Sequence, residues 1–518
     1  MRISGCLSVF LATTAVSTTV PADEIRDTLV VTASRIPVPL SATGSSVSVI
    51  DREQIDARQA VFAVDLLQDV PGVAVSRSGS IGSQTQVRVR GAEANQVLVL
   101  IDGIRANDPA GNDEFAFQDL TTWDVERIEV VRGPQSALWG SDALAGVINV
   151  ITRQPTEEFS AGGFAEAGSF DTYSLGGRVA GEVLGTRAGL SLSRVNSNGS
   201  NSSRSGSEND GYSNTTGTLT LVGSPQDNLN LDLVGRYTDS NKEFDAPDYS
   251  SLVPTYLPAD SSDESRVKQG YFGAGGTLKL LGDRWTQSLR AAWTTTDTDT
   301  WNNSGDQGST AADIYGLYYQ TSWQFTPGAL DSPGNSVTFA AVHEQQDFQQ
   351  RGPVNPNQDQ EQRTTGAVLE LVLSPLAQTY MSLSARYDHN SAYDSVATYR
   401  ATTAWTAEST RSRLHASYGT GQKAPTFTER FGYYPDQFVG NPDLKPETSK
   451  GWEIGIDQPF FDDRVNLGAT YFHENLEDEI LTVFIDAPPP VFFLSTTENL
   501  AGTSKRRGVE VTAGARVT

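Results

Sequence analysis

From about residue 155 to its end, the chain repeats segments of about 8–12 residues in which apolar and polar side chains alternate. Successive side chains of a β-strand point to opposite faces, so these segments predict strands with one apolar and one polar face. One example alternates Met381, Leu383, Ala385 and Tyr387 with Ser382, Ser384, Arg386 and Asp388. Small polar residues on one face and aromatic residues at strand ends are typical of a transmembrane β-barrel. A soluble β-rich protein is the alternative.

The connections between these segments alternate in length. The stretches 224–228 and 281–284 are tight, whereas 196–213, 241–267, 296–313 and 350–363 are long, polar and rich in Asn, Asp and Gly. Short periplasmic turns and long outer loops are the arrangement of an outer-membrane barrel. No internal run reaches the roughly 18 apolar residues that a membrane helix requires.

The chain divides into four regions that differ in composition and hydropathy pattern. Residues 1–22 predict a secretory signal peptide, with Arg2 before a short apolar segment and cleavage near Ala22. The single cysteine, Cys6, lies inside it, so the mature chain is expected to have no disulfide. Residues 23–34 are a polar leader, residues 35–154 a compact mixed domain, and residues 155–518 the barrel strands. The formal net charge of −25 argues against nucleic-acid binding.

The compact region combines helical and strand patterns. The spacing of apolar residues over 51–70 predicts two short helices. Strands are predicted over 87–91, 97–103, 125–131 and 147–152, and the uninterrupted apolar run of the second predicts a fully buried strand.

Four motifs resemble those of the TonB-dependent outer-membrane receptors, most closely the cobalamin receptors of that family. They are DTLVVTA (27–33), VLVLIDGIRAN (97–107), VERIEVVRGPQSALWGSDALAGVINVIT (125–152) and KAPTFTERFGYYPDQFVGNPDLKPETSKGWEIG (423–455). The resemblance implies an all-β membrane protein in the outer membrane of a Gram-negative bacterium, a 22-stranded transmembrane β-barrel with a small α+β plug at 35–154. Against that count, residues 155–518 are too few, and we expect the last strands to be missing and the barrel to be C-terminally incomplete.

The leader at 23–34 contains the segment that resembles a TonB box. A short β-prone segment between polar flanks can add as an edge strand to a partner protein. The partner implied by the family is the C-terminal domain of TonB with its inner-membrane energising complex. The alternative is that the segment pairs within its own plug. The box residues are Asp27, Thr28, Leu29, Val30, Val31, Thr32 and Ala33.

A plug–barrel charge cluster is expected from two barrel carboxylates and two plug arginines. Glu453 lies between Trp452 and Ile454, and Glu510 between Val509 and Val511, so both carboxylates are predicted to face the lumen. The resemblance implies that they pair with Arg90 and Arg132, as a lock that holds the plug. Solvated lumen charges are the alternative.

Two plug loops are the expected ligand contacts, because the equivalent loops of cobalamin receptors touch the ligand. Both loops are rich in small polar residues, and ordinary surface loops are the alternative reading. The predicted ligand-binding residues are Ser78, Gly79, Ser80, Gly82, Ser83 and Gln84 in the first loop, and Asn107, Asp108 and Asn112 in the second.

Calcium is the expected cofactor, in the outer loops, and no covalent cofactor is expected. Glu208 and Asp210 alternate beside Gly211, as in loops that bind hard cations, and Asp245 follows one hairpin later. These three match ligand positions of the cobalamin receptors, and Asp260 or Asp263 is a further candidate. Gly206, however, falls where that family has a side-chain ligand. Solvated acidic loops are the alternative.

The sequence thus predicts active uptake of a scarce nutrient, with cobalamin first and a ferric siderophore second among metal chelates. A passive porin or adhesin barrel and a soluble secreted β-enzyme are readings from other classes. No nucleophile–base set and no HExxH motif is present, so no enzyme is predicted. A monomer embedded in outer-membrane lipid is expected.

Overall fold

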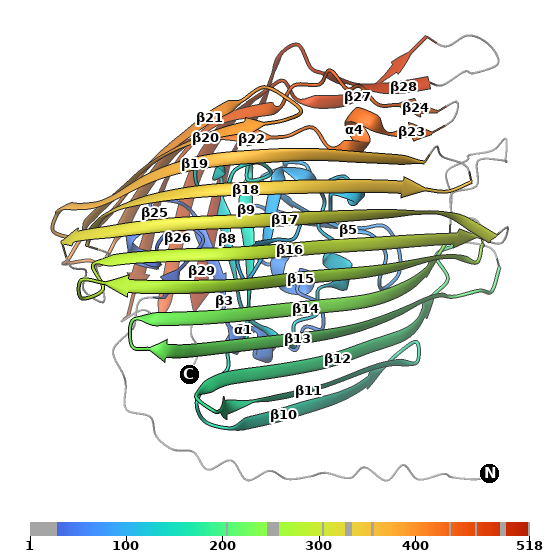
Figure 1. Ribbon diagram of the computed structural model, residues 1–518. Helices are drawn as coiled ribbons and strands as arrows, with labels where there is room; N and C mark the ends of the chain where they lie inside the picture. The colour runs from blue at the N-terminus through green and yellow to red at the C-terminus, as the bar shows by residue number, and fades with distance from the viewer. Residues whose placement is uncertain are drawn as a thin grey trace.

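The alternating segments form one large curved sheet in the computed structural model (Figure 1). The structure describes residues 28–203, 206–245, 258, 260–302, 305–326, 334–353, 357–434, 437–461, 464–486 and 494–515. The sheet has 16 strands, and every neighbouring pair is antiparallel. In order across the sheet they are β10 (Ser160–Gly168), β11 (Thr172–Val183), β12 (Thr186–Ser200), β13 (Asp210–Gln226), β14 (Leu229–Phe244), β15 (Asp263–Leu280), β16 (Trp285–Asn302), β17 (Gly305–Thr326), β18 (Asn335–Arg351), β19 (Gln358–Leu376), β20 (Thr379–Asn390), β21 (Val396–Thr406), β22 (Arg413–Lys423), β25 (Glu447–Phe460), β26 (Val465–Glu477) and β29 (Thr503–Ala515).

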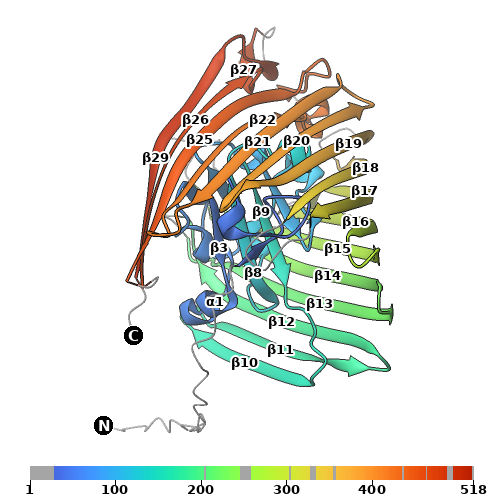
Figure 2. The same ribbon diagram turned by 90° about the vertical axis from the view of Figure 1, so that its left-hand side faces the viewer.

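The predicted orientation of the side chains is confirmed. On β20, Met381 and Tyr387 point outward and are 37% and 55% exposed, whereas Arg386 and Asp388 point inward and are buried. Apolar side chains outside and polar ones inside are what a barrel wall in lipid requires. Strands β10 and β29 are the two edges of the described sheet and do not pair with each other (Figure 2).

The predicted alternation of short and long connections holds for the long connections after β12, β14, β22 and β26, but it fails between β16 and β17. Strand β16 continues to Asn302 and β17 begins at Gly305, so most of the expected loop 296–313 is paired strand. Its threonines are β-branched and suit a strand even where no lipid faces them. Strands β16 and β17 therefore continue into the region where a loop was expected, on the long-connection side at the right of Figure 1.

A small domain fills the concave side of the sheet (Figure 2). Its central sheet has the order β3–β8–β9–β6–β7, in which β6 and β9 are parallel. The bounds are β3 (Val47–Ile50), β8 (Val125–Arg132), β9 (Gly146–Thr152), β6 (Val97–Ile101) and β7 (Ile104–Arg105). Two pairs flank it, β1 (Leu29–Val30) with β2 (Val38–Pro39), and β4 (Val73–Arg77) with β5 (Thr85–Val89).

The two helices predicted over 51–70 are present as α1 (Arg52–Arg58) and α2 (Val64–Leu67). Asp51 begins α1 with a capping box, in which its side chain accepts from the N–H of Gln54 at 2.9 Å. Ile55 and Leu67 pack into the same core as Val99, and β6 is buried at every position, as predicted. The remaining helical turns are α3 (Ser136–Trp139), η1 (Leu40–Ala42), η2 (Ala94–Gln96), η3 (Pro109–Gly111) and η4 (Phe117–Asp119).

The long connections carry structure of their own. The helix α4 (Phe427–Phe431) follows β22, and a separate four-stranded sheet stands beside it on the long-connection side. Its strands are β23 (Tyr433–Tyr434), β24 (Phe438–Val439), β28 (Leu494–Asn499) and β27 (Ile480–Ile485). No helix in the described part of the chain is both long and apolar enough to cross a membrane.

Candidate functional site

The predicted charge cluster between plug and barrel is assembled around Arg90. Its Nη1 donates to Glu453 on β25 at 2.7 Å, and its Nε and Nη2 donate to the two oxygens of Glu510 on β29, both at 2.9 Å. The guanidinium also lies 4.3 Å from the ring centre of Phe472. All three charged side chains are buried. Burial disfavours the charge, but Glu453 and Glu510 outweigh it and raise the pKa of Arg90.

Arg132 completes the predicted set at the edge of this cluster. Its Nε lies 3.5 Å from Glu510, and its Nη1 donates to the carbonyl of Pro71 at 2.7 Å. The structure therefore brings all four predicted residues together. Sequence reasoning missed Ser46, whose N–H donates to Glu453 at 2.7 Å.

The first predicted ligand loop lies between β4 and β5. Ser78, Gly79 and Gln84 are exposed, and Ser80 and Ser83 are half-buried. Gly82 is buried, with φ of 82°, and any side chain there would collide with the ring of Tyr212 on β13. Ser80 Oγ donates to the backbone carbonyl of Asp210 at 3.3 Å. The loop thus joins the plug to the predicted metal ligands.

The second predicted ligand loop is placed differently from the expectation. The amide of Asn107 is buried, donates to the carbonyls of Val97 and Asp113, and accepts from the N–H of Val99 at 2.7 Å. Asp108 is buried and caps η3 by accepting from Ala110 N–H at 2.9 Å. Both side chains therefore serve the loop's own structure rather than face a ligand, because hydrogen bonds to the backbone of β6 hold the amide of Asn107 in the core.

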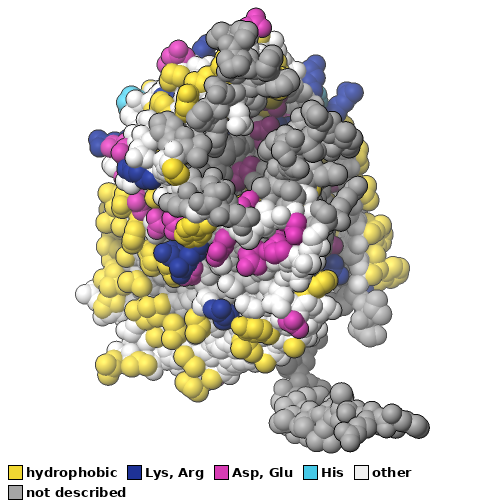
Figure 3. Space-filling model, turned by 90° about the vertical axis from the view of Figure 1, so that its right-hand side faces the viewer, with side chains coloured by type: hydrophobic (Ala, Val, Ile, Leu, Met, Phe, Trp, Pro, Cys, Tyr) yellow, Lys and Arg dark blue, Asp and Glu magenta, His cyan; other side chains and the backbone are white. Residues whose placement is uncertain are grey.

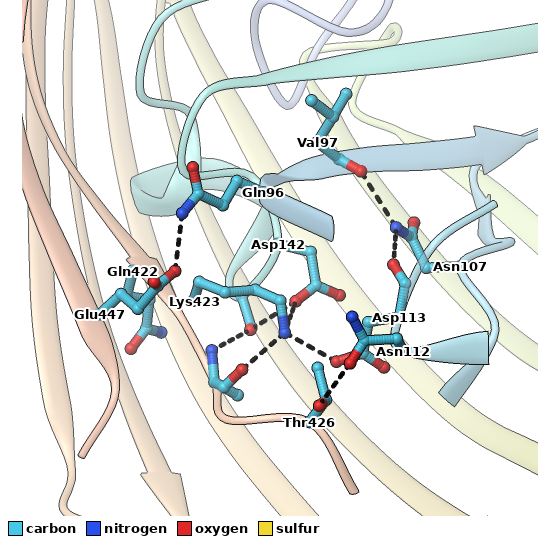
Figure 4. Close-up of polar contacts among 12 residues, drawn as sticks. Gln96, Val97, Asn107, Asn112, Asp113, Asp142, Gln422, Lys423, Thr426 and Glu447 are labelled. Carbon is cyan, nitrogen blue, oxygen red and sulfur yellow. Dashed lines mark hydrogen bonds and ion pairs between the residues drawn. The ribbon is translucent and has the colours of Figure 1, made fainter. Parts of the chain in front are cut away.

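Asn112 remains half-buried, and its Oδ1 accepts from Thr426 at 2.9 Å. Next to it lies a second plug–barrel ion cluster that the sequence did not predict (Figure 4). The ammonium of Lys423, at the end of β22, donates to Asp113 at 2.7 Å and lies 3.5 Å from Asp142. Asp142 also pairs with Arg105. Lys423 is fully buried, and its position at the start of the motif 423–455 is the only sequence signal.

The three predicted metal ligands lie together. One carboxylate oxygen of each of Glu208, Asp210 and Asp245 falls within 4.8 Å of the other two. Burial, followed by the charges of Asp210 and Asp245, raises the pKa of Glu208 to about 7. The face with the long connections shows acidic side chains over its centre and apolar ones along its flanks (Figure 3).

The predicted box is docked on the plug, apart from Asp27, which lies outside the described residues. Leu29 and Val30 pair with Pro39 and Val38. A single oxygen of Glu129 accepts from the N–H groups of Val31 and Thr32 at 3.0 and 3.1 Å. Val30, Thr32 and Ala33 are buried. In this conformation the segment is folded into its own plug, the alternative raised from the sequence.

Two family profiles match this architecture. The family described as "TonB dependent receptor-like, beta-barrel" matches residues 159–517, and "TonB-dependent Receptor Plug Domain" matches residues 39–147. The chain belongs to the TonB-dependent receptor family. It therefore lies in the outer membrane of a Gram-negative bacterium, and its family is one of transporters rather than enzymes.

Relatives of this receptor include two proteins named vitamin B12 transporter BtuB. The one from Vibrio vulnificus is 30% identical over 478 residues, 90% of this chain and 72% of its own length. The one from Photobacterium profundum is 30% identical over 444 residues, 83% of this chain and 67% of its own length.

The solved structures that share this fold include a siderophore receptor and a ferric enterobactin receptor. The siderophore receptor PirA from Acinetobacter baumannii aligns with a TM-score of 0.76 at 17% identity, over 90% of this chain and 78% of its own. The ferric enterobactin receptor PfeA from Pseudomonas aeruginosa aligns with a TM-score of 0.74 at 16% identity, over the same shares. At these identities the likeness concerns the fold alone.

A cavity of about 650 Å³ separates the receptor's plug from its wall. Gly103 and Trp139 line it from the plug, and Arg290 and Gln320 from β16 and β17. Val31 of the docked leader also lines this cavity. Departure of the leader would therefore enlarge the space beside the wall.

Proposed function

We propose that this receptor imports cobalamin across the outer membrane in a TonB-coupled step, with calcium bound by Glu208, Asp210 and Asp245. The observation that carries the proposal is the contact of Ser80, in the exposed plug loop, with Asp210 of the acidic cluster. A cation that orders the cluster would order the loop that meets the ligand. The two relatives named vitamin B12 transporters support the choice of substrate.

The donor set fits calcium. Ca²⁺ prefers carboxylate and carbonyl oxygens in a flexible arrangement. Glu208 Oε2, Asp210 Oδ1 and Asp245 Oδ2 are buried oxygens that accept no hydrogen bond within the described structure. Buried acceptors without a donor are costly, so a cation on them would stabilise the outer loops.

Asp260 is a further candidate ligand. Gly206 has φ of 98°, and a side chain at that position would collide with the carboxylate of Asp260. Asp260 therefore occupies the space beside Gly206, where the related receptors are expected to have a ligand side chain. Its charge also raises the pKa of Glu208, after burial and the other carboxylates.

The charge of the outer face favours cobalamin over an anionic ferric chelate. Acidic side chains gather over the centre of that face (Figure 3), and the whole chain has a net charge of −25. An outer face with charges of one sign raises the local concentration of ligands of the opposite charge and repels ligands of the same charge. Ferric catecholates carry net negative charge, whereas cobalamins are neutral or cationic.

Coupling to TonB would use the leader as a handle. Leu29 and Val30 already adopt strand geometry, so the same segment can pair with an edge strand of TonB once it leaves Val38 and Pro39. The Arg90–Glu453–Glu510 cluster would meanwhile hold the plug in register with the wall, since buried charge pairs specify position more than they add stability.

The test is binding of cyanocobalamin to the purified receptor in detergent, measured once with millimolar calcium and once with a calcium chelator. Tight binding that calcium strengthens, and that Asp245→Asn makes independent of calcium, is the expected result. Glu361→Gln is the matched control, because Glu361 pairs with Arg363 at 2.6 Å outside the cluster. Absence of binding in both conditions would contradict cobalamin as substrate.

A ferric siderophore receptor is the second candidate. In that case a ferric chelate would bind the same receptor while cyanocobalamin would not, and Asp245→Asn would leave that binding unchanged. A passive porin is disfavoured because the plug occupies the concave side of the wall (Figure 2).

A further inference from the structure

The docked leader is held at one point by a tryptophan of the plug. The indole Nε1 of Trp139 donates to the backbone carbonyl of Thr32 at 2.8 Å. Trp139 ends α3, which packs against β20, β21 and β22 of the wall. Thr32 itself is fully buried. This hydrogen bond therefore joins the leader to a plug segment that rests on the wall.

The other end of that segment reaches the ligand side of the plug. Three residues after Trp139, Asp142 pairs with Arg105 and lies 3.5 Å from the ammonium of Lys423. Ser141 Oγ accepts from the N–H of Ala424 at 2.9 Å. Ser136 Oγ accepts from the N–H of Gln422 at 3.0 Å, so residues 136–142 contact the end of β22 at both ends and the leader through Trp139 between them.

Lys423 links this segment to the second predicted ligand loop. Its ammonium is shared between Asp113 at 2.7 Å and Asp142 at 3.5 Å, and all three side chains are buried (Figure 4). A buried ammonium cannot lose a carboxylate partner without a large penalty. If a ligand displaces Asp113, Lys423 must therefore close on Asp142 and move the segment that carries Trp139.

The leader has other anchors, among them Glu370 on β19, which accepts from Ser34, and Arg400 on β21, which donates to the carbonyl of Ala33. A further anchor on the plug, Glu129, has no link to the ligand side within the described residues. Glu129, which accepts from Val31 and Thr32, lies on β8, between β3 and β9 of the plug's central sheet. Its second oxygen accepts from Arg127 of the same strand at 2.9 Å. Glu129 therefore provides fixed attachment, whereas Trp139 lies on a segment that contacts both the wall and the ligand side.

We infer that Trp139 is a positioning residue for transport, which keeps the leader docked and releases it when the 136–142 segment moves. The inference rests on the proposed role of the leader as the TonB handle. The segment relays a displacement from Asp113, through Lys423 and Asp142, to the carbonyl of Thr32.

The experiment measures release of the leader without ligand and without TonB. Val30 is fully buried when docked, so the rate at which a thiol reagent labels Val30→Cys, in a Cys6→Ser background, reports release. Trp139→Phe keeps the ring but removes the donor. We expect labelling to become about two- to tenfold faster, the range that loss of one hydrogen bond produces.

Trp123→Phe is the matched control. Trp123 is also a plug tryptophan, but its indole donates to the carbonyl of Gly177 on β11 at 3.3 Å and not to the leader. Its labelling rate should equal that of the parent. No acceleration in Trp139→Phe, or an equal acceleration in Trp123→Phe, would overturn the inference.

A double variant tests the relay itself. Asp142→Asn should also accelerate labelling, because the segment loses its charged anchor. Residues that act through one contact are not additive, so Trp139→Phe with Asp142→Asn should label no faster than Trp139→Phe alone. Fully multiplicative effects would contradict the link between Asp142 and Trp139.

A separate arm distinguishes this inference from the proposed function. A peptide of residues 25–35 is titrated with the C-terminal domain of TonB. Binding supports the leader as handle. Failure to bind would contradict the proposed function of the leader, and the inference that rests on it, even if the labelling shows that Trp139 holds the leader in place.

Discussion

Arg90 and Glu453 lie 363 residues apart in the sequence, yet their guanidinium and carboxylate meet at 2.7 Å across the interface between plug and wall. Each of the two side chains is almost completely buried. Because both side chains are buried, solvent cannot replace either partner, and we expect the seating of the plug to depend on this contact.

Removing the carboxylate should therefore loosen the plug. In Glu453→Ala the Arg90 charge loses one of its two buried partners, which is expected to cost about 3–5 kcal/mol. The urea concentration at which plug tryptophan fluorescence changes should fall. Glu477→Ala is the control, because its pair with Lys450 at 3.3 Å is exposed and should be worth about 0–1 kcal/mol. Equal shifts in both variants would show that the buried pair has no special role.

The acidic cluster should bind calcium with all three carboxylates. Glu208→Gln, Asp210→Asn and Asp245→Asn each remove one charged ligand, and calcium affinity measured by isothermal titration should fall at least tenfold in each. Glu361→Gln should retain the parental affinity. A parental affinity in all three variants would mean that any calcium binds elsewhere.

The second plug loop should loosen as pH rises. Burial raises the pKa of Asp108 from 3.8 to about 7, so the folded loop holds a proton that the unfolded chain loses above about pH 4. Stability of the loop is thus greatest below pH 4 and falls as pH rises to 7, by up to about 4 kcal/mol. Hydrogen-exchange protection of residues 110–114, corrected for intrinsic rates, measures this loss.

Asp108→Asn is neutral at every pH and keeps an oxygen for the N–H of Ala110. Its protection factors should be flat between pH 4 and 7. A slope identical to that of the parent would assign the pH dependence to another group.

The leader should transmit force only if its backbone can pair. Leu29 is 51% exposed and pairs with Pro39. Leu29→Pro removes its N–H, so we expect ligand binding to persist while uptake falls to background. Leu29→Ala, which keeps the backbone, should transport normally. Uptake by the proline variant would show that the handle lies outside this segment.

Much of the fold was predictable because it repeats short-range patterns. Alternation of Met381, Leu383 and Tyr387 with polar residues is enough to set the two faces of β20, since side-chain direction in a strand has a period of two. The ends of strands were less predictable. Residues 296–313 look like a polar loop, but pairing between β16 and β17 extends through most of them because neighbouring strands supply hydrogen bonds that composition does not reveal.

The candidate sites also include some residues whose placement could be predicted from the sequence and others whose placement could not. Glu208 and Asp210 are near neighbours in the chain, and Asp245 directly follows the paired strand β14, so their meeting follows from one hairpin. Asn107 looks like a loop residue, but its direction is decided by the buried strand that precedes it.

By itself the sequence determined the alternating wall, the buried strand β6 and the inward direction of Glu453 and Glu510. These depend on local periodicity, which is written in consecutive residues. Only the tertiary structure decided that Lys423 meets Asp113, 310 residues away, and that Trp139 holds the carbonyl of Thr32. Such contacts depend on the position of the plug inside the wall and on the register of all the strands that lie between the two residues in the sequence. No local sequence pattern specifies these together.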